Sequence, residues 1–491
     1  MKHSSKTITR RTFLADSAVL ATVSLVGSRM SPALAAATEV APHQAMGTKV
    51  GEVTDTAAIV WTRLTAGPER NNAGLVIPGQ AQKGTLLRGP LTVPVAGLEG
   101  ACPGAAGRVR VRFDLREDLR DAQTTGWADV SAEKDFTHQF PLTGLRPASV
   151  YHYVAETTGP GGAPAHGAFR GRFTTAPAPT VPSDVRFCVT TCQGYQDRDH
   201  PDGHPIYPAM LAFAPHFVAF TGDNVYYDSD APPAESAELA RYHWERMFSL
   251  PRQIALLRNV SSYFEKDDHD TLRNDSWPGA KVGTLTFAEG QEIFRQQVPL
   301  GESIYRTFRW GRDLQIWLTD GRDFRSPNTM PDGPDKTIWG AEQKAWFQRT
   351  VAASDATWKV LISPTPLVGP DRSRKNDNHA NVGFRTEGDE LRSWLQKNAP
   401  ENFLVICGDR HWQYHSVHPR TGVREFGCGP ASDSHAAGAP GENRAYHRFL
   451  RVKGGFLSVT LRREGSESVI LCEHRDVDGV VKHEWRNARK V

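Results

Sequence analysis

The chain has 491 residues, of which 39% are hydrophobic, and its formal net charge is +3. This length is too great for one ordinary domain and sufficient for two or three, and the composition excludes a disordered chain. Because acidic and basic residues are mixed along the chain, the charge argues against an obligate nucleic-acid partner, while it is compatible with a small anionic substrate.

Residues 1–37 have the order of an export signal. A basic segment that contains Arg10 and Arg11 is followed by an apolar and small-residue run from Ala18 to Val26, and small residues continue to Ala37. This order predicts a twin-arginine signal peptide. No later stretch approaches the roughly 18 apolar residues of a membrane span. We therefore expect a mature protein without stable membrane insertion, located in the periplasm or outside the cell.

Residues 43–176 carry the alternating patterns of β-strands. VGEVTDTAAIVWTRL and RVRVRFDL alternate polar and apolar residues. The later pattern Leu-x-Gly-Leu-x-Pro followed by Tyr-x-Tyr resembles the late strands of a fibronectin type III domain. We expect a small β-sandwich here, with no clustered catalytic residues, and a proline-rich linker over 177–184.

Residues 185–491 show a different pattern, in which short apolar runs alternate with helical segments. The helical segments are expected over 237–259, 340–354 and 388–399. Such alternation predicts an α/β domain with a largely buried sheet. The last stretch returns to strands, so we expect a β-rich C-terminal part with a second sheet packed on the first.

Six cysteines occur without the spacing of a disulfide framework or a zinc pair. An oxidising compartment permits one or two bridges, and the sequence does not assign them. Cys188 and Cys192 lie four residues apart at the end of an expected strand, so a redox pair is a further alternative.

Four polar clusters follow four of the expected strands. In open α/β sheets, ligands bind beyond the carboxyl ends of the strands, so the clusters are expected to converge. Their potential ligands and catalytic groups are Cys192 in TTCQ, Asp223 and Tyr226 in GDNVYYD, Asp268, His269 and Asn274 in KDDHDTLRND, and Asp409 and His411 in CGDRHW. Each cluster alone has an ordinary structural explanation, such as a turn, a cap or a solvated loop, but four together favour one metal site.

The donor types restrict the metal. Carboxylates, an amide oxygen and a phenolate suit ferric iron, calcium, magnesium or manganese, and a thiolate together with a phenolate favours ferric iron over calcium. Asp223 is the expected bridge between two ions, because a carboxylate between two cations can bind both. Two ions roughly 3.5–4 Å apart can clamp a phosphoryl group and activate water.

The order of these motifs resembles the PhoD-like alkaline phosphatase/phosphodiesterases, which belong to the calcineurin-like metallophosphoesterases. The segment WGAEQKAWFQRTVAASDATWKVLISPTPL, the export signal and the N-terminal sandwich extend the resemblance over nearly the whole chain. It implies an α/β fold with an N-terminal β-sandwich and a two-sheet αββα catalytic domain. It also implies that Cys192, Asp223 and Tyr226 bind iron and that Asp409 is a further metal ligand. Asn274 matches an asparagine that binds a second metal, calcium in the best-known form.

The resemblance further implies that Asp268 is a metal ligand. His269 is then expected to contact phosphate or to protonate the leaving oxygen, and His411 to act as a ligand or a phosphate contact. The sequence departs from the family pattern at Lys266, at Asn224-Val225 and over 377–388, which puts substrate choice in doubt. An anionic substrate could be contacted there by Arg372, Arg374, Lys375 or Asn381. Of these we predict Arg372 and Asn381 as substrate-binding residues.

The function expected is a secreted metal-dependent phosphoesterase that acts on a small-molecule or polymeric phosphate ester. Two alternatives stay open. A purple-acid-type phosphatase shares Gly-Asp-x-x-Tyr but normally ends in Gly-His-x-His, where this chain has Asp409. A non-catalytic extracellular binding protein is the other, and the intact set of ligands argues against it. The natural substrate and the oligomeric state are not determined by the sequence.

Overall fold

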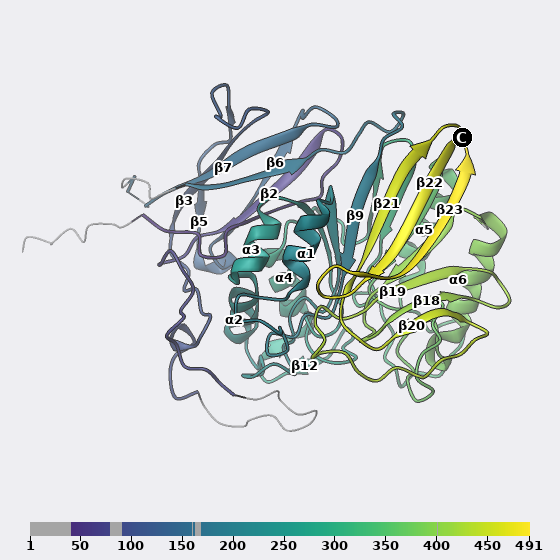
Figure 1. Ribbon diagram of the computed structural model, residues 1–491. Helices are drawn as coiled ribbons and strands as arrows, with labels where there is room; N and C mark the ends of the chain where they lie inside the picture. The colour runs from purple at the N-terminus through teal and green to yellow at the C-terminus, as the bar shows by residue number, and fades with distance from the viewer. Residues whose placement is uncertain (1–40, 79–90, 160, 163–167, 400) are drawn as a thin grey trace, which may run out of the picture. The chain divides into compact units, whose positions relative to one another are not determined.

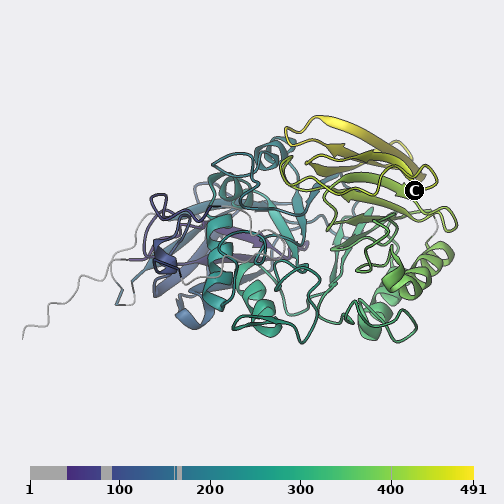
Figure 2. The same cartoon turned by 90° about the horizontal axis from the view of Figure 1, so that it is seen from below.

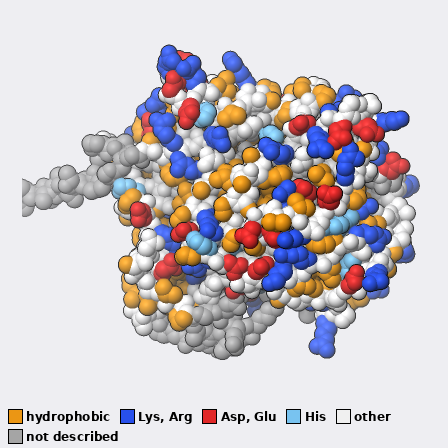
Figure 3. Space-filling view, in the orientation of Figure 1, with side chains coloured by type: hydrophobic (Ala, Val, Ile, Leu, Met, Phe, Trp, Pro, Cys, Tyr) orange, Lys and Arg blue, Asp and Glu red, His pale blue; other side chains and the backbone are white. Residues whose placement is uncertain are grey.

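The structure is a computed structural model that describes residues 41–78, 91–159, 161–162, 168–399 and 401–491. The predicted twin-arginine signal peptide lies outside the described residues. Within them, no helix is both long and apolar enough to cross a bilayer. On the face shown in Figure 3, basic and acidic side chains are interspersed.

The larger of the two central sheets has nine strands in the order β23-β22-β21-β9-β10-β11-β1-β2-β6. Its three central strands are parallel: β9 (Val185–Thr190), β10 (Phe217–Thr221) and β11 (Ser261–Glu265). The last three strands continue from β9 and lie together in Figures 1 and 2: β21 (Phe456–Glu464), β22 (Glu467–Arg475) and β23 (Val481–Lys490). Strands from the N-terminal region complete the other side: β1 (Thr48–Gly51), β2 (Ala57–Arg63) and β6 (Thr137–Thr143).

The second central sheet has seven strands in the order β14-β15-β16-β17-β19-β18-β20. Four adjacent strands are parallel to one another: β15 (Leu314–Leu318), β16 (Trp358–Ser363), β17 (Phe403–Cys407) and β19 (Arg424–Cys428). Antiparallel strands lie at its two sides: β14 (Arg306–Trp310), β18 (Gln413–Val417) and β20 (His447–Arg451).

Helices cover the outer face of each sheet, and Figure 1 shows them in two groups. The first group is α1 (Ile206–Phe213), α2 (Ala237–Phe248), α3 (Pro251–Leu257) and α4 (Phe287–Gln297), and the second is α5 (Gly340–Ala353) and α6 (Arg385–Asn398). The alternation of strand side chains explains these layers. In β10, Phe217 and Ala219 join the core between the sheets, whereas Val218 and Phe220 join the core beneath the first group of helices. The predicted two-sheet αββα fold is confirmed.

The prediction of one helix over 237–259 is wrong in one respect, because the structure has two helices there, α2 and α3. Pro251 occupies the first turn of α3. Proline has no backbone N–H and clashes with the preceding turn of a continuing helix, but it is well suited to begin one.

The N-terminal region forms two β layers. One is a five-stranded sheet that consists of β3 (Gly107–Asp114), β4 (Gln123–Thr124), β5 (Ala128–Val130), β7 (Val150–Thr158) and β8 (Phe169–Thr174). The other is β1, β2 and β6, and side chains such as Val60 and Val111 lie in one core between the layers. The expected N-terminal β-sandwich is therefore present. Its second layer is not a separate sheet, because β1 pairs with β11 and extends the nine-stranded sheet.

An ion-pair cluster also joins the N-terminal region to the helices. The guanidinium of Arg63, at the end of β2, lies 2.8 Å from a carboxylate oxygen of Asp135 and 2.8 Å from one of Glu245 on α2, and it is almost fully buried. The remaining short elements are the strands β12 (Lys281–Val282) and β13 (Leu285–Thr286) and the 3-10 helices η1 (Val95–Gly97), η2 (Ala132–Lys134) and η3 (Val382–Phe384).

Candidate metal centre

Three of the predicted ligands occupy the same position relative to three different strands. Cys192, Asp223 and Asp409 are each the second residue after the end of β9, β10 and β17. All three have positive φ angles, of 52°, 52° and 64°. Residues other than glycine rarely adopt this conformation, and when they do they often lie at functional sites. The three turns thus direct a thiol and two carboxylates toward one point.

Two glycines allow the strand ends to approach each other. A Cβ on Gly408 would lie 2.4 Å from Thr221 Oγ1 and 2.6 Å from Thr191 Oγ1, and one on Gly222 would lie 2.6 Å from the Cβ of Asp267. Side chains at these positions would separate the end of β17 from the ends of β9 and β10. Asp409, which comes from the second sheet, could then not reach the ligands of the first.

The ligand atoms lie close together around Asp223. Asp223 Oδ2 is 3.4 Å from Cys192 Sγ and 3.2 Å from the hydroxyl oxygen of Tyr226, and that hydroxyl is 3.3 Å from His411 Nε2. Three groups each place their ligand atoms within 4.8 Å of one another: Cys192, Asp223 and His411; Asp223, Asp268 and His269; and Asp223, Asp267 and Asp409. Asp223 belongs to all three, as a bridging ligand should.

Three buried carboxylate oxygens in this cluster accept no hydrogen bond: Asp223 Oδ1, Asp267 Oδ2 and Asp409 Oδ2. The last of these lies 3.0 Å from the guanidinium of Arg410. Leaving a buried polar atom unpaired costs about 1–3 kcal/mol, and more when it is charged. Burial also raises the pKa of Asp223 and of Asp267 well above the ordinary value, and it raises that of Asp409 to about 6. A bound cation would supply the missing partners, so these residues fit a metal ion.

The protonation states of Cys192, Tyr226 and His411 also bear on metal binding. Burial, with the nearby Asp223 carboxylate, raises the pKa of the Cys192 thiol and of the Tyr226 phenol well above their ordinary values. Both groups bind metal only when deprotonated, so metal binding must displace their protons. Burial and the neighbouring His435 lower the pKa of His411, which keeps its imidazole neutral as a ligand should be.

Asp228 holds two of the predicted site residues in place. Its carboxylate lies 2.5 Å from His269 Nδ1 and accepts a hydrogen bond from the backbone N–H of Asn274 at 2.8 Å. Burial disfavours the charged form of His269, but Asp228 and Asp268 outweigh it and raise its pKa well above the ordinary value. Because Nδ1 is occupied, Nε2 is the nitrogen left for a substrate.

Arg322 and Asp275 surround the Asp268 carboxylate. The Arg322 guanidinium bonds to Asp267 at 2.5 Å and lies 3.5 Å from Asp268 Oδ2, and the backbone N–H of Asp275 donates to the same Oδ2 at 2.5 Å. Although burial opposes ionisation, Arg322 and His269 lower the pKa of Asp268. The Asn274 side chain donates to the carboxylate of the adjacent Asp275 at 2.7 Å.

Asp270, which belongs to the same sequence motif, has a different role. Its carboxylate accepts hydrogen bonds from the backbone N–H of Asp267 at 2.7 Å and of Asn224 at 3.0 Å. It joins the turns after β10 and β11 and belongs to none of the three ligand groups. Asn224, one of the departures from the family pattern, is likewise buried and bonded to Asp270 through its side chain at 2.7 Å.

His435 is part of the site although the sequence patterns do not point to it. Its Nε2 is 2.9 Å from the Tyr226 hydroxyl oxygen, its Nδ1 is 2.8 Å from an Asp197 carboxylate oxygen, and its ring centroid is 4.2 Å from that of His411. It comes from the loop after β19, in SDSHAAG, where a lone histidine among small residues carries no motif.

Asn381 and Arg372, the two residues predicted to contact substrate, differ in how far their side chains are already bonded within the protein. Asn381 donates to Asp377 at 2.9 Å and accepts from the Gly383 N–H at 3.1 Å, so both ends of its amide hold the loop before η3. Arg372 Nε lies 3.6 Å from a carboxylate oxygen of Asp371, and its guanidinium carbon lies 5.4 Å from the ring of Trp412. Because 35% of the Arg372 side chain stays exposed, part of it remains available to a ligand.

Lys266 and Lys375 are both engaged with carboxylates. Lys266 is buried and pairs with Asp320 at 2.5 Å and with Asp323. Lys375 lies 2.9 Å from Asp377. Lys266 therefore replaces the family's usual residue within a buried ion-pair network and does not face a substrate.

All six cysteines lie in the described part of the chain, and none forms a disulfide. Cys188 packs beneath the helices, whereas Cys192 faces the ligand cluster. The two side chains therefore lie in different environments, and they form no disulfide with each other.

Comparisons with known proteins agree with this geometry. The family model described as PhoD-like phosphatase matches residues 187–452, and the model of the PhoD-like phosphatase N-terminal domain matches 29–177. A solved structure of PhoD is similar over 91% of this chain and 92% of its own, with a TM-score of 0.68 and 18% identity. A purple acid phosphatase from seeds of yellow lupin (Lupinus luteus) is similar over 90% and 74%, with a TM-score of 0.60 and 13% identity. No curated protein matches the chain significantly.

The shared position of Asp223 can be tested by metal content. Asp223→Asn is expected to lower the amount of every bound metal, because the residue belongs to all three ligand groups, whereas Cys192→Ser should lower only the metal held with His411. Elemental analysis per mole of purified protein measures both. Cys188→Ala, in the adjoining strand but outside the cluster, is the control and should retain all metal. Full metal content in Asp223→Asn would contradict the shared role.

Proposed function

The chain belongs to the PhoD-like phosphatase family, and from this premise we propose that it is an exported phosphoesterase that hydrolyses phosphomonoesters or phosphodiesters. The family and the fold identify it as a metal-dependent phosphoric ester hydrolase. The observation that carries the proposal is the convergence of three ligand groups on Asp223, because a carboxylate between two cations suits a two-metal phosphoesterase.

We assign ferric iron to Cys192, Asp223, Tyr226 and Asp409, because a thiolate and a phenolate together favour this ion. We assign calcium, or another divalent ion such as magnesium or manganese, to Asp223, Asp268 and Asn274, which offer only oxygen ligands. When bound, these ions supply Lewis acidity toward the phosphoryl oxygens and lower the pKa of water at the site.

The protein's own groups then orient the ester and handle the proton. Asp228 fixes the ring of His269 through Nδ1 at 2.5 Å, so that Nε2 can donate to a phosphate oxygen or to the leaving oxygen. His411 lies where it can act as a ligand or contact phosphate. The partly exposed side chain of Arg372 is suited to an anionic substrate that enters from solvent.

The two alternatives are less well supported. A purple-acid-type phosphatase shares the fold, since the lupin enzyme is similar over most of this chain. However, the family matched is PhoD-like, and Cys192 and Asp409 both lie in the ligand cluster. A purely binding protein would not need buried carboxylate oxygens without partners, which this site has.

Hydrolysis and its dependence on metal are the direct test. We expect the purified protein to release nitrophenol from bis(4-nitrophenyl) phosphate or 4-nitrophenyl phosphate. Prolonged treatment with a chelator should abolish the activity because the ligands alone cannot polarise the phosphoryl group, and adding back iron with calcium should restore it. Activity of a metal-free protein, or no turnover of any phosphate ester by the fully metal-loaded protein, would contradict the proposal.

Asp228→Asn tests the positioning of His269. The variant is expected to lower kcat by about 10- to 100-fold, the usual effect of losing a partner that orients a metal-site residue. KM should change less, because Asp228 contacts His269 and Asn274 and does not touch the substrate. Asp355→Asn, whose carboxylate is 91% exposed, is the matched control. An unchanged kcat in Asp228→Asn would show that the position of His269 does not limit the reaction.

Export by the twin-arginine route is tested in cells of the native host. Replacing Arg10 and Arg11 with lysine preserves the charge but removes the arginine pair that the route reads. The variant should accumulate in the cytoplasm, whereas the wild type should appear in the periplasm or the medium. The same replacement at Arg116 and Arg120, in an exposed loop, is the control. Equal export of both variants would reject the twin-arginine assignment.

A further inference from the structure

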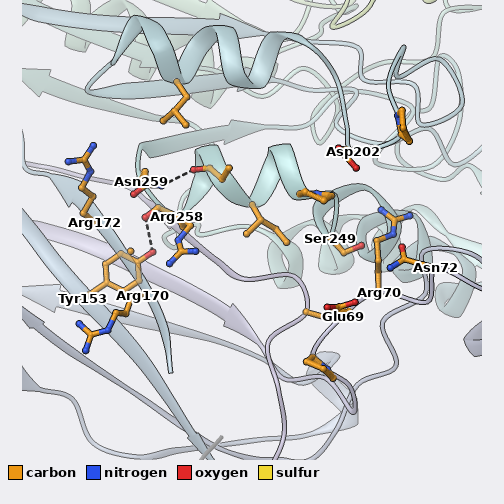
Figure 4. A pocket seen from close by; sticks show the side chains of 18 of the residues that line it. Glu69, Arg70, Asn72, Tyr153, Arg170, Arg172, Asp202, Ser249, Arg258 and Asn259 are labelled. Carbon is orange, nitrogen blue, oxygen red and sulfur yellow. Dashed lines mark hydrogen bonds between the residues drawn. The ribbon is translucent and has the colours of Figure 1, made fainter. Parts of the chain in front are cut away.

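A cleft of about 1250 Å³ lies between the five-stranded sheet and helix α3, and it contains none of the proposed metal ligands. Its walls come from β7, β8 and α3 and from the loops around residues 68–72 and 198–202. Figure 4 shows its side chains in two groups, with Arg170, Arg172 and Arg258 in one and Glu69, Arg70 and Asp202 in the other. Cavities of several hundred Å³ are typical of sites for small organic ligands.

Charge is divided unequally between the two groups. Arg70, in the second group, is paired with Glu99 at 2.7 Å. Within the part of the chain that the structure describes, Arg170, Arg172 and Arg258 form no ion pair with any carboxylate. Glu117, which also lines the cleft, is exposed and pairs with none of the three. The first group is therefore a set of cations without counter-ions.

The backbone around these arginines is held firmly. The N–H of Arg172 donates to the carbonyl oxygen of Arg258 at 2.8 Å, which fixes the edge strand β8 against the end of α3. The Arg258 guanidinium carbon lies 4.5 Å from the ring centroid of Phe169, so the ring covers one face of the group and leaves its N–H edge free. His152 is paired with Arg172 in the β7–β8 register and lies on the same face of the sheet.

Other arginines of the same sheet do have partners. Arg110, on the neighbouring strand β3, lies 2.7 Å from Glu156. Arg170 and Arg172 are exposed and Arg258 is half-buried. Like charges that line one cleft repel each other, so an anion bound between them would relieve this repulsion. The fixed fork of N–H donors in arginine matches phosphate oxygens, which it binds through two parallel hydrogen bonds.

We propose that Arg170, Arg172 and Arg258 form a second anion site, apart from the metal centre, for a small organic ligand that carries two phosphate groups. Two features favour a bisphosphate over a single phosphate ion. The arginines come from two different elements, β8 and the end of α3, and the cleft is much larger than one phosphate ion requires. Asn72 and Ser249, which lie beside the second group, offer polar contacts to the uncharged part of such a ligand.

Calorimetric titration with fructose 1,6-bisphosphate tests this site. Full-length Asp223→Asn is the parent protein, so that the probe is not hydrolysed and the outcome does not depend on phosphoesterase activity. The parent should bind the probe. Arg170→Gln with Arg172→Gln should weaken binding by at least about tenfold, since hydrogen bonds to charged groups contribute about 1.5–3 kcal/mol and 1.4 kcal/mol is tenfold. Arg258→Gln, as an independent variant, should weaken it as well.

Arg462→Gln with Arg486→Gln is the matched control. Both arginines are exposed on strands of the nine-stranded sheet, bond to Glu464 and do not line the cleft, so the double variant should bind as the parent does. In the wild-type background, the Arg170 and Arg172 replacements should leave hydrolysis of a nitrophenyl ester unchanged. Thermal melting of each variant separates loss of binding from loss of folding.

Several outcomes would overturn the inference. One is unchanged affinity when Arg170 and Arg172 are replaced in a folded protein. Another is binding that occurs in the wild type but not in Asp223→Asn, because the probe would then occupy the metal centre. Equal affinity for inorganic phosphate and for the bisphosphate would reject a ligand with two phosphate groups.

Discussion

The burial of several acidic groups around Asp223 is the constraint on which the site depends. Asp223 Oδ1 and Asp267 Oδ2 have no hydrogen-bond partner, and burial raises the pKa of both carboxyl groups and of the Cys192 thiol. No folded protein gains stability from such a cluster alone, because each buried acid must either keep its proton or find a cation. The cluster is therefore explained as a metal site. There the free energy of metal binding offsets the free-energy cost of burying the unpaired acidic groups.

The scaffold brings these groups together through short turns at the ends of strands. Cys192, Asp223 and Asp409 need left-handed backbone conformations, and Gly408 lets the turn after β17 approach Thr191 and Thr221. The two sheets share one apolar core, so their carboxyl ends are held at a fixed separation. Ligands from both sheets can thus converge without long loops, and rigid packing, not loop closure, determines their positions.

Much of this arrangement follows from local sequence patterns, and the rest does not, for identifiable physical reasons. Apolar runs followed by Cys192, Asp223 and Asp409 predict the strand ends because side-chain alternation and turn residues are local properties. Asp228, Arg322 and His435 act through contacts across 41 to 209 positions of the chain, which no pattern records. The pairing of β1 with β11 is equally non-local. Asn381 is a further case, since the sequence does not show that its amide bonds to Asp377 and to the backbone of Gly383.

The loop between β9 and α1 connects the metal centre with the cleft. Asp197 in this loop bonds to His435, which in turn contacts the Tyr226 hydroxyl. Arg198 and Asp202, from the same loop, line the cleft. The N-terminal region supplies the opposite wall of the cleft and, through β1, part of the sheet that carries Asp223. The β-sandwich therefore contributes to the cleft as well as to the sheet. A ligand in the cleft would lie against the loop whose Asp197 orients His435 at the metal centre.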